Sequence, residues 1–363
     1  MPLAAVLAAT AIVAAACSSG TSESDASRGS SAPAETAAAQ SLGAPEANSD
    51  GSPSEIRIAY QAIPNGDLVV KNEGWLEEAF PNTQITWTKF ESGGDVNTAV
   101  IAGAVDIGLA GSSPVTRGLS EPLNIPYAVP WIHDVIGAAE SLVARDDSGV
   151  TSVAGLKGKK IATPFASTAH YSLLAALKEA ELTESDVTLV DLEPTDILAA
   201  WTRGDIDAAY VWSPTLDEIK KSGKVLTTSA ALAKLGYPTY DLAIVTNAFR
   251  EAYPAAVQEW LRQQDRAVQL IKSDPTAAAA QIAPQLSITP AEVQSQLKGL
   301  VFLGQEEQQS AKHFGTSSVP GTFADSLLKA AEFLKTDAID AVPSLATLQA
   351  GIDTTDLTDA FKK

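Results

Sequence analysis

Cysteine is almost absent from this 363-residue chain, and its single copy is Cys17. One cysteine cannot form a disulfide within the chain or supply a cluster of metal-binding thiolates. Histidine is also scarce: His133, His170 and His313 are the only copies, and they do not follow the spacing of paired metal ligands. The sequence therefore predicts no bound metal and no cofactor.

Positive charge is in short supply. The chain has 25 Lys and Arg residues against 44 Asp and Glu residues, which gives a formal net charge of −19. Nucleic-acid phosphates and anionic lipid surfaces repel a protein of this charge. Charge therefore argues against nucleic acid as a partner and mildly disfavours polyanionic ligands.

Two common catalytic motifs are missing as well. The sequence contains neither a Gly-x-Ser-x-Gly elbow nor a Gly-x4-Gly-Lys-Ser/Thr phosphate loop. Residues 155–160 are rich in Gly and Lys but lack the spacing and the following helix of such a loop. An enzyme is therefore not expected.

Long hydrophobic runs are lacking. Residues 3–16 form an apolar run that is too short to span a bilayer and ends in small residues just before Cys17. We interpret residues 1–16 as a lipoprotein signal peptide and Cys17 as the lipidated N-terminus of an extracytoplasmic protein. The run has no preceding Lys or Arg, and Ala14 stands where lipoboxes usually have Leu. The alternative is a buried N-terminal helix with an incidental cysteine.

Residues 17–54 are predicted to be a flexible tether. From residue 18 to 55 the chain is rich in Ser, Ala, Glu, Gly and Pro, has no aromatic residue, and has Leu42 as its only large aliphatic residue. Such a segment buries too little apolar surface to order itself. As a flexible chain it would span roughly 30–35 Å on average.

One sequence unit occurs twice, as GAVDIGLAGSSP at 103–114 and GDIDAAYVWSP at 204–214. In each copy the Gly is predicted to end a helix, the Asp leads into a short buried strand, and Ser-Pro supplies the N-cap of the next helix. A chain that builds this unit twice is expected to have two α/β lobes. A cleft between lobes is a usual place for a small ligand.

Apolar periodicity extends this α/β pattern along the chain. Alternating or short apolar runs predict strands, and 3.6-residue spacing predicts helices. Strands are expected at 56–61, 85–90, 140–145, 188–192 and 240–245, a turn followed by a strand at 155–164, and helices at 75–80, 95–102, 167–180 and 253–271. This order predicts mainly parallel sheets flanked by helices, with a C-terminal third that is almost all helix.

Two segments make a resemblance specific, PFASTAHYSLLAALK at 164–178 and AAWTRGDIDAAYVWSP at 199–214. With AYQ at 59–61, KFESG at 89–93 and GSSP at 111–114, they resemble the substrate-binding proteins of ABC importers for taurine and aliphatic sulfonates, and the taurine-binding branch most closely. The likeness runs from about residue 56 to the C-terminus.

This resemblance implies a two-lobed periplasmic binding protein fold of type II, with two crossovers between lobes. Carried onto this chain, the limits are 1–16 for the signal peptide, 17–54 for the tether, 55–137 and 245–363 for the first lobe, and 138–244 for the second.

The resemblance also implies a function. The expected protein is a monomeric, lipid-anchored receptor that binds taurine, or a similar small sulfonate, and delivers it to an ABC permease with its ATPase. Three alternatives stay open: a binder of another alkanesulfonate or small anion, a ligand-sensing protein that docks on a receptor, and an enzyme like those of pyrimidine-precursor synthesis.

Taurine has a sulfonate at one end, so a pocket for it needs donors there. Helix N-termini supply free N–H groups and a positive dipole end. Ser112 and Ser113 begin one expected helix, and Ser167, Thr168 and His170 begin another; their hydroxyls add donors. Plain N-capping is the alternative role of Ser112 and Ser113, and His170 is equally well a polar core residue or a partner of its own loop.

The other end of taurine is an ammonium group, which needs acceptors. Glu140 and Asp241 each begin an otherwise apolar strand, where a carboxylate is costly to bury without a partner. The resemblance implies the same role, because taurine binders keep acids at the matching positions. The alternative is a structural salt bridge between lobes, with Arg145 or Lys157 as the cation.

Three further residues complete the predicted site. Trp212 and Tyr60 are expected to wall the short carbon linker, and Gln61 is expected to donate to a ligand oxygen. As alternatives, both aromatic residues are ordinary core residues at strand ends.

Overall fold

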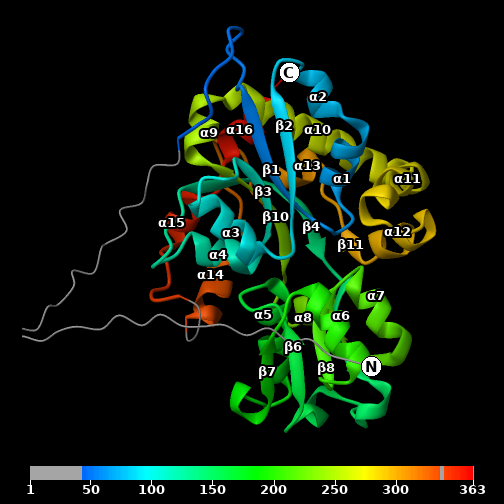
Figure 1. The fold of residues 1–363 in the computed structure, drawn as a ribbon. Coiled ribbons are helices and arrows are strands. Elements are labelled where there is room, and N and C mark those ends of the chain that lie inside the picture. Colours follow the sequence, from blue (N-terminus) through cyan, green and yellow to red (C-terminus); the bar gives the residue numbers. More distant parts are fainter. Residues whose placement is uncertain (1–42, 336–338, 363) are drawn as a thin grey trace, which may run out of the picture. The chain divides into compact units, whose positions relative to one another are not determined.

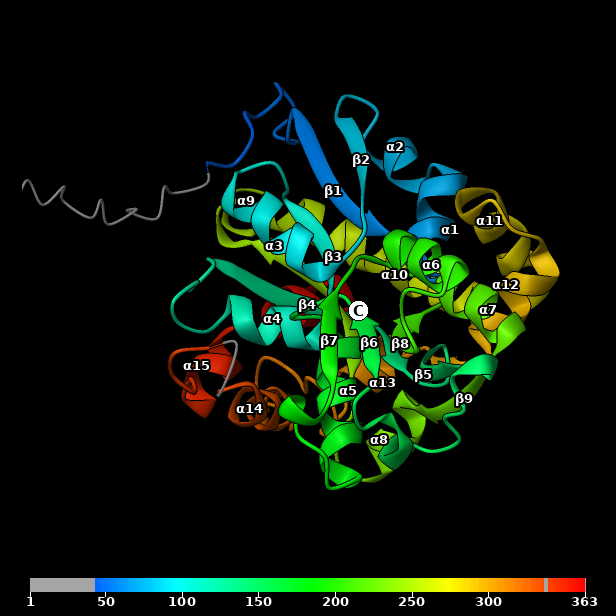
Figure 2. The same ribbon diagram turned by 60° about the horizontal axis from the view of Figure 1, so that its bottom comes forward.

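Two β-sheets form the framework of the chain, and helices cover both (Figures 1 and 2). The computed structural model describes residues 43–335 and 339–362, which belong to one compact unit. The expected signal peptide, Cys17 and residues 17–42 of the expected tether lie outside the described residues. Within them, no helix combines the length and the apolar character needed to cross a bilayer.

The first sheet has six strands in the order β11-β4-β10-β3-β1-β2. They are β1 (Glu55–Gln61), β2 (Gln84–Phe90), β3 (Ile107–Gly111), β4 (Tyr127–Ile136), β10 (Tyr240–Thr246) and β11 (Leu300–Val301). Together with its helices, this sheet is the first lobe. The helices are α1 (Gly66–Glu73), α2 (Trp75–Ala79), α3 (Gly93–Ile101), α4 (Ser112–Gly118), α9 (Asn247–Ala252), α10 (Pro254–Ser273), α11 (Pro275–Leu286), α12 (Pro290–Leu297), α13 (Gln305–Gln308), α14 (Phe323–Leu334), α15 (Leu345–Ala350) and α16 (Thr354–Ala360).

The second sheet has five strands in the order β7-β6-β8-β5-β9, and with its helices it forms the second lobe. Its strands are β5 (Glu140–Arg145), β6 (Lys160–Thr163), β7 (Thr188–Asp191), β8 (Ala208–Trp212) and β9 (Gly223–Thr228). Its α-helices are α5 (Thr168–Glu179), α6 (Pro194–Arg203), α7 (Thr215–Ile219) and α8 (Ser229–Lys234). Short 3-10 helices lie at Asp146–Ser148, Val153–Leu156, Glu184–Asp186 and Lys220–Ser222.

Each sheet mixes parallel and antiparallel strands, whereas the sequence predicted mainly parallel ones. β1 runs parallel to β2 and β3, and β6 runs parallel to β7 and β8. In contrast, β10 runs antiparallel to β3 and β4, and β5 runs antiparallel to β8 and β9. β5 and β10 are the strands that the chain enters on passing from one sheet to the other. They lack the helical crossover that joins neighbouring parallel strands, so nothing requires them to be parallel.

The chain passes between the sheets twice. It leaves the first sheet after Ile136 and enters the second at Glu140, and it returns between the end of α8 and Tyr240. Residues 240–244, which the sequence placed in the second lobe, pair in β10 with strands of the first sheet. Asp241 therefore belongs to the first lobe.

The described end of the expected tether is held on the first lobe. The side chain of Asn48 donates to the carbonyl of Asn82 at 2.9 Å, and the hydroxyl of Tyr253 donates to the carbonyl of Pro45 at 2.6 Å. These contacts order residues 43–54 with little apolar burial, chiefly at Ala44 and Pro53, which is why their composition did not predict it.

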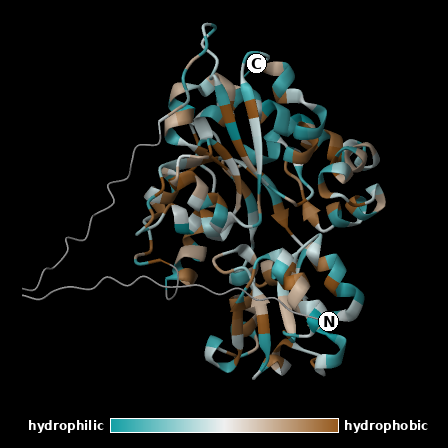
Figure 3. Cartoon of the chain, in the orientation of Figure 1, coloured by the Kyte–Doolittle hydropathy of each residue, from teal (hydrophilic) through white to brown (hydrophobic). Residues whose placement is uncertain are grey.

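Hydrophobic residues are concentrated in the strands of both sheets (Figure 3). In β5, Leu142 packs with α5 on one face of the second sheet, and Val143 packs with α6 and α7 on the other. All five residues of β3 are buried in the same way. Continuous apolar runs of this kind are typical of strands that helices cover on both sides.

The repeated sequence unit folds alike in both lobes. Gly103 and Gly204 follow α3 and α6 with positive φ values of 73° and 79°, and the buried strands β3 and β8 come next. The expected serine N-caps are wrong in both copies, because Gly111 caps α4 and Pro214 caps α7. In the first copy the extended backbone of Gly111 leads directly into the helix, so Gly111 occupies the N-cap position and Ser112 is the first residue of the helix.

The aspartate of each unit ties two parallel strands together. Asp106 accepts from the backbone N–H of Arg57 at 2.9 Å, and Asp207 accepts from that of Lys160 at the same distance. Asp106 is also bound by the Arg57 guanidinium at 2.6 Å and is 2% exposed, whereas Asp207 is 33% exposed and lies 3.7 Å from Lys159. The two copies therefore share a geometry but differ in burial.

This difference predicts unequal costs for one substitution. Asp106→Asn keeps an acceptor for the backbone but leaves the guanidinium unpaired, so it should lower the free energy of unfolding by about 1–3 kcal/mol. Asp207→Asn, in the exposed copy, should cost less than about 1 kcal/mol. Urea unfolding of both variants measures the two costs, and equal losses would contradict the prediction.

Candidate functional site

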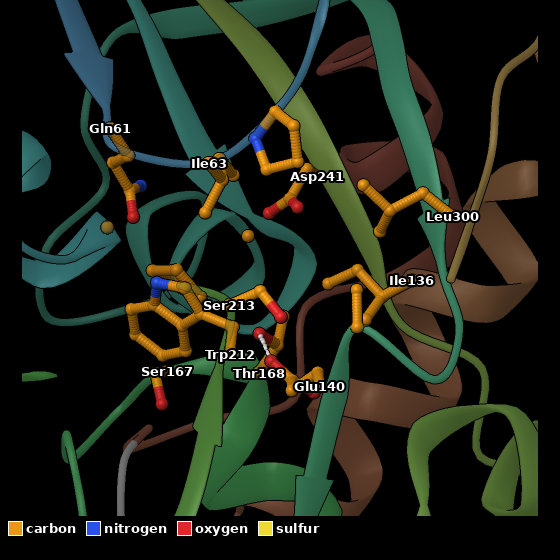
Figure 4. A pocket seen from close by; sticks show the side chains of 15 residues that line it. Gln61, Ile63, Ile136, Glu140, Ser167, Thr168, Trp212, Ser213, Asp241 and Leu300 are labelled. Carbon is orange, nitrogen blue, oxygen red and sulfur yellow. Dashed lines mark hydrogen bonds between the residues drawn. The ribbon is translucent and has the colours of Figure 1, made fainter. Parts of the chain in front are cut away.

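A pocket lies between the two lobes, close to both passages of the chain (Figure 4). It encloses about 490 Å³ of space that no protein atom fills, part of it open to solvent. Both lobes line it. The lining residues are Gln61, Ile63, Pro64, Gly93, Gly111, Pro114, Ile136, Asp241 and Leu300 from the first lobe, Glu140, Ser167, Thr168, Trp212 and Ser213 from the second, and Ala139 between them.

Strand ends place the polar residues of the pocket. Gln61 ends β1 and Trp212 ends β8, whereas Glu140 is the first residue of β5. Because β5 runs antiparallel to β8, Glu140 pairs directly with Trp212; in the same way Asp241 pairs with Gly111, the last residue of β3. Each sheet therefore turns one edge, with one acidic residue, toward the pocket.

Glu140 is 1% exposed, and three hydroxyl groups bind its carboxylate. Thr168 Oγ1 donates to Oε2 at 2.6 Å, Ser229 Oγ donates to Oε1 at 2.7 Å, and Ser172 Oγ donates to Oε1 at 3.4 Å. Burial raises the pKa of Glu140, and the hydroxyls oppose that rise because they stabilise the charged form. The sequence predicted the acid, and α5 and α8 supply its donors.

Asp241 approaches the pocket from the first lobe and is 9% exposed (Figure 4). Burial, followed by the charge of Glu140, raises the pKa of Asp241 to about 8. A carboxyl group of this kind keeps its proton at neutral pH until a cation or a donor approaches it.

The salt bridge between lobes that the sequence left open does not form. Arg145 pairs with Asp147 at 2.9 Å, and Lys157 pairs with Asp186 at the same distance. Along the described part of the chain, no basic side chain pairs with either acid of the pocket. Glu140 and Asp241 thus have no basic partner among the described residues.

Apolar side chains complete the walls. The indole of Trp212 lies across the pocket from Ile136 and Leu300, and Ile63 covers the side near Gln61 (Figure 4). The sequence predicted Trp212 as a wall. It missed the aliphatic residues because they lie in a loop and at strand ends, where no periodic pattern marks them.

The hydroxyls of the α5 N-terminus are already engaged in this structure. Ser167 caps the helix: its Oγ accepts from the N–H of His170 at 3.1 Å and donates to the carbonyl of Pro164 at 2.6 Å. Thr168 donates to Glu140. Both residues line the pocket, but both hydroxyls already have partners within the protein, and the Ser167 N–H donates to the carbonyl of Pro164 at 3.4 Å.

Ser112 and Ser113 begin α4 but do not line the pocket; their neighbours Gly111 and Pro114 do. Ser112 Oγ accepts from the N–H of Tyr240 at 3.2 Å, so it ties α4 to β10. Ser113 is 1% exposed, and its hydroxyl has no hydrogen-bond partner among the described residues.

Tyr60 and His170 are not among the residues that line the pocket. The ring of Tyr60 packs edge-on against Trp87 and lies 5.0 Å from Lys71 Nζ. The His170 ring stacks on Phe165 with centroids 4.5 Å apart. These contacts match the alternatives that the sequence left open, a core role for Tyr60 and a partner of its own loop for His170.

Gln61 lines the pocket in an unexpected orientation. Its Nε2 donates to the carbonyl of Leu109 at 3.0 Å, and its oxygen points toward Trp212 (Figure 4). The side chain therefore offers an acceptor to the pocket, whereas the sequence reasoning gave it a donor role.

The lobes touch each other around the rim of the pocket. Ser92 Oγ donates to Glu193 at 3.1 Å, and Thr195 Oγ1 donates to Glu91 at 3.1 Å. Burial, followed by the charge of Asp95, raises the pKa of Glu193 to about 7. The lobes are thus in a closed arrangement in which acidic groups of both lobes lie near one another.

Sequence reasoning missed one further acid, Asp134 of β4, which is fully buried. It interrupts an apolar strand in the same way as Glu140, and that signal was available. Among the residues that the structure describes, no group of three or more His, Cys, Asp or Glu side chains is arranged to hold a metal ion.

The raised pKa of Asp241 predicts how stability depends on pH. The folded protein keeps this proton up to a pH of about 8, whereas the unfolded chain releases it near 3.8. The stabilisation is therefore complete at low pH and is lost as the pH rises toward 8, by up to about 1.4 kcal/mol per pH unit. Urea unfolding from pH 5 to 8 should show this fall, and Asp241→Asn should reduce the slope. An unchanged slope in the variant would contradict the prediction.

Known proteins match this chain along most of its length. Residues 66–278 match the model of the NMT1/THI5-like family. The chain is 33% identical over 297 residues to the taurine-binding periplasmic protein of Escherichia coli strain K12, which covers 80% of this chain and 88% of that protein.

Solved structures share the fold. The alkanesulfonate-binding protein SsuA from Xanthomonas axonopodis pv. citri, bound to MOPS, superposes with a TM-score of 0.66 at 23% identity, covering 83% of this chain and 98% of that one. The desulfurization enzyme DSZB superposes with a TM-score of 0.58 at 17% identity, covering 85% of this chain and 98% of that one. The chain has the two-lobed α/β fold of periplasmic binding proteins, and it belongs to the NMT1/THI5-like family.

Proposed function

We propose that this chain is the extracytoplasmic substrate-binding component of an ABC importer and that its pocket closes on taurine, 2-aminoethanesulfonate. The observation that carries the proposal is the pair of buried acids, Glu140 and Asp241, which face one pocket without a basic partner among the described residues. The similarity to a protein named for taurine binding supports it. The chain is proposed to bind and deliver its ligand without catalysing a reaction.

The two ends of taurine fit two kinds of group in the pocket. Its ammonium group would lie between Glu140 and Asp241, where it replaces the missing cation. Its sulfonate would accept from backbone N–H groups at the N-termini of α3 and α5, which reach the pocket at Gly93 and Thr168. The hydroxyl of Ser213 is an additional donor on the lining.

Apolar walls suit the short carbon chain between these ends. Trp212, Ile63 and Ile136 line the middle of the pocket, and with a ligand bound they would exclude water from it. Exclusion of water strengthens the attraction between ammonium and carboxylate. An alkanesulfonate without an amine would leave both acids unpaired, so it is the less favoured ligand.

Ligand binding would proceed with closure of the lobes about the two passages between the sheets. Contacts such as Ser92 to Glu193 exist only when the lobes meet, so a ligand held by both lobes favours the closed state. The closed protein would then dock as a monomer on a permease that an ATPase drives.

Calorimetric titration with three ligands tests the ligand assignment. Taurine should bind at least about tenfold more tightly than ethanesulfonate, a difference of about 1.4 kcal/mol. β-Alanine, which has the amine but a carboxylate in place of the sulfonate, should also bind more weakly. Glu140→Gln and Asp241→Asn should each reduce the preference for taurine over ethanesulfonate.

Asp205→Asn is the matched control, because Asp205 is an exposed acid on the second lobe that pairs with Arg203. It should keep the wild-type preference. Equal affinity of the wild type for taurine and ethanesulfonate would remove the role given to Glu140 and Asp241.

We also propose that the lipid anchor expected from the sequence holds this receptor at a membrane through Cys17. Cys17→Ser should leave taurine affinity unchanged and should shift the protein from the membrane fraction to the soluble fraction. Fractionation of cells that express each form, with detection by immunoblot, measures this shift. A variant that stays with membranes would argue against lipidation.

A further inference from the structure

A third carboxylate, that of Asp134, lies behind the two acids of the pocket. In the ladder between β4 and β10, Asp134 is the direct antiparallel partner of Asp241. Directly opposed residues point to the same face of a sheet, with Cβ atoms about 4.5–5.5 Å apart. Ile136, two residues further along β4, lines the pocket, so this face of the strand is turned to the pocket.

The carboxyl group of Asp134 lacks hydrogen-bond donors among the described residues. The residue is fully buried, and neither carboxyl oxygen has a hydrogen-bond partner among the described residues. In this respect it differs from Glu140, which three hydroxyls bind. A buried carboxylate without partners is strongly unfavourable, so the group resists ionisation.

The charges that face Asp134 make ionisation harder still. Asp241 on β10 and Glu140 on β5 both raise the pKa of Asp134, in addition to its burial. The neighbouring His133 turns to the other face of β4, where it lies 3.6 Å from Asp67, and burial lowers its pKa. Within the described ranges, no Lys or Arg pairs with Glu140 or Asp241, which line the pocket, or with Asp134, which is buried beside Asp241 and does not line it.

Three carboxylates this close cannot all be charged without a cation. Like charges that share a low-dielectric site keep at least one proton bound. Glu140 is the best stabilised as an anion because of its three donors. The retained proton therefore belongs to the pair of Asp134 and Asp241.

We propose that Asp134 is a third ligand-selecting acid of this pocket: with Asp241 it holds a proton in the ligand-free protein, and the ammonium group of the ligand displaces that proton. The inference rests on the proposed function, because it needs an amine-bearing ligand. The exchange balances in charge: one ammonium enters, one proton leaves to the buffer, and the negative charge that the pair gains lies beside the new cation.

This exchange ties ligand affinity to pH. Below the pH at which the pair ionises, binding must expel a proton, so affinity rises with pH, by up to about tenfold per pH unit for one proton released. An alkylammonium group keeps its own charge through this range. Ethanesulfonate brings no cation and should release no proton.

Titration calorimetry on the full chain, in phosphate and in imidazole, tests the proposal, because the difference in apparent enthalpy counts the protons released. Neither buffer carries a sulfonate that would compete for the pocket. At pH 7 the wild type should release on the order of one proton per taurine, and its affinity should rise from pH 6 to 8. Asp134→Asn, which cannot ionise, removes the part of this release that comes from Asp134, so it should release fewer protons than the wild type and show a flatter pH profile, while the proton that burial and Glu140 hold on Asp241 is still released.

Asp67→Asn is the matched control. Asp67 is a buried acid of the same lobe whose pKa burial raises to about 7, but it faces His133 and Gln264 rather than the pocket. It should keep the proton release of the wild type. Urea unfolding of each variant reports whether it is folded.

The outcomes separate the two claims. Failure of the wild type to bind taurine refutes the proposed function. Binding without proton release by the wild type overturns the role of Asp134 and needs no variant. Equal proton release by the wild type and Asp134→Asn overturns it as well, since Asp134 would then keep its proton with or without ligand.

Discussion

Repulsion between buried carboxylates is the interaction on which the pocket depends. Glu140 comes from the second sheet and Asp241 from the first, so the charge of one acts on the other across the boundary between lobes. If both acids were ionised in this buried site they would repel each other, and burial together with that repulsion keeps the proton on Asp241 up to a pH of about 8. Bringing the lobes together therefore has an electrostatic cost, and a small cation between the acids turns the same geometry into an attraction.

Unequal surroundings give the acids different roles. Hydroxyls of α5 and α8 donate to Glu140 and favour its charged form. Asp134 has no such donor among the described residues, and Asp241 lines the pocket. When the environments of neighbouring carboxyl groups push their pKa values apart, one group generally stays ionised and the other keeps its proton. Glu140 is then the fixed anion of the pocket, and the two aspartates of the first sheet are its proton-holding side.

The sequence predicted those parts of the fold and site that have a local signal. Apolar alternation located most strands, the repeated unit indicated two lobes, and an acid at the head of an apolar strand indicated Glu140 and Asp241. The mixed sheets were missed because strand direction depends on how the chain crosses between lobes. Ser112 and Tyr60 were misplaced because a helix start or a strand end fixes a position along the chain, not the direction of a side chain. Asp134 had the same local signal as Glu140, and only the cross-strand register revealed its partner.

Closure of the lobes sets a second limit on what the pocket can accept. At the rim, burial and then the charges of Asp95 and Glu91 of the first lobe raise the pKa of Glu193 of the second lobe. Closure therefore brings carboxyl groups of the two lobes close to one another at the rim, as it does for the acids inside the pocket. If the proposed function holds, the ammonium group of the ligand offsets both, since it is the cation that closure encloses. The positive charge of the ammonium group, which distinguishes the ligand, thus also favours the closed state. A ligand without this charge would bind more weakly, because neither the acids of the pocket nor those of the rim would be offset.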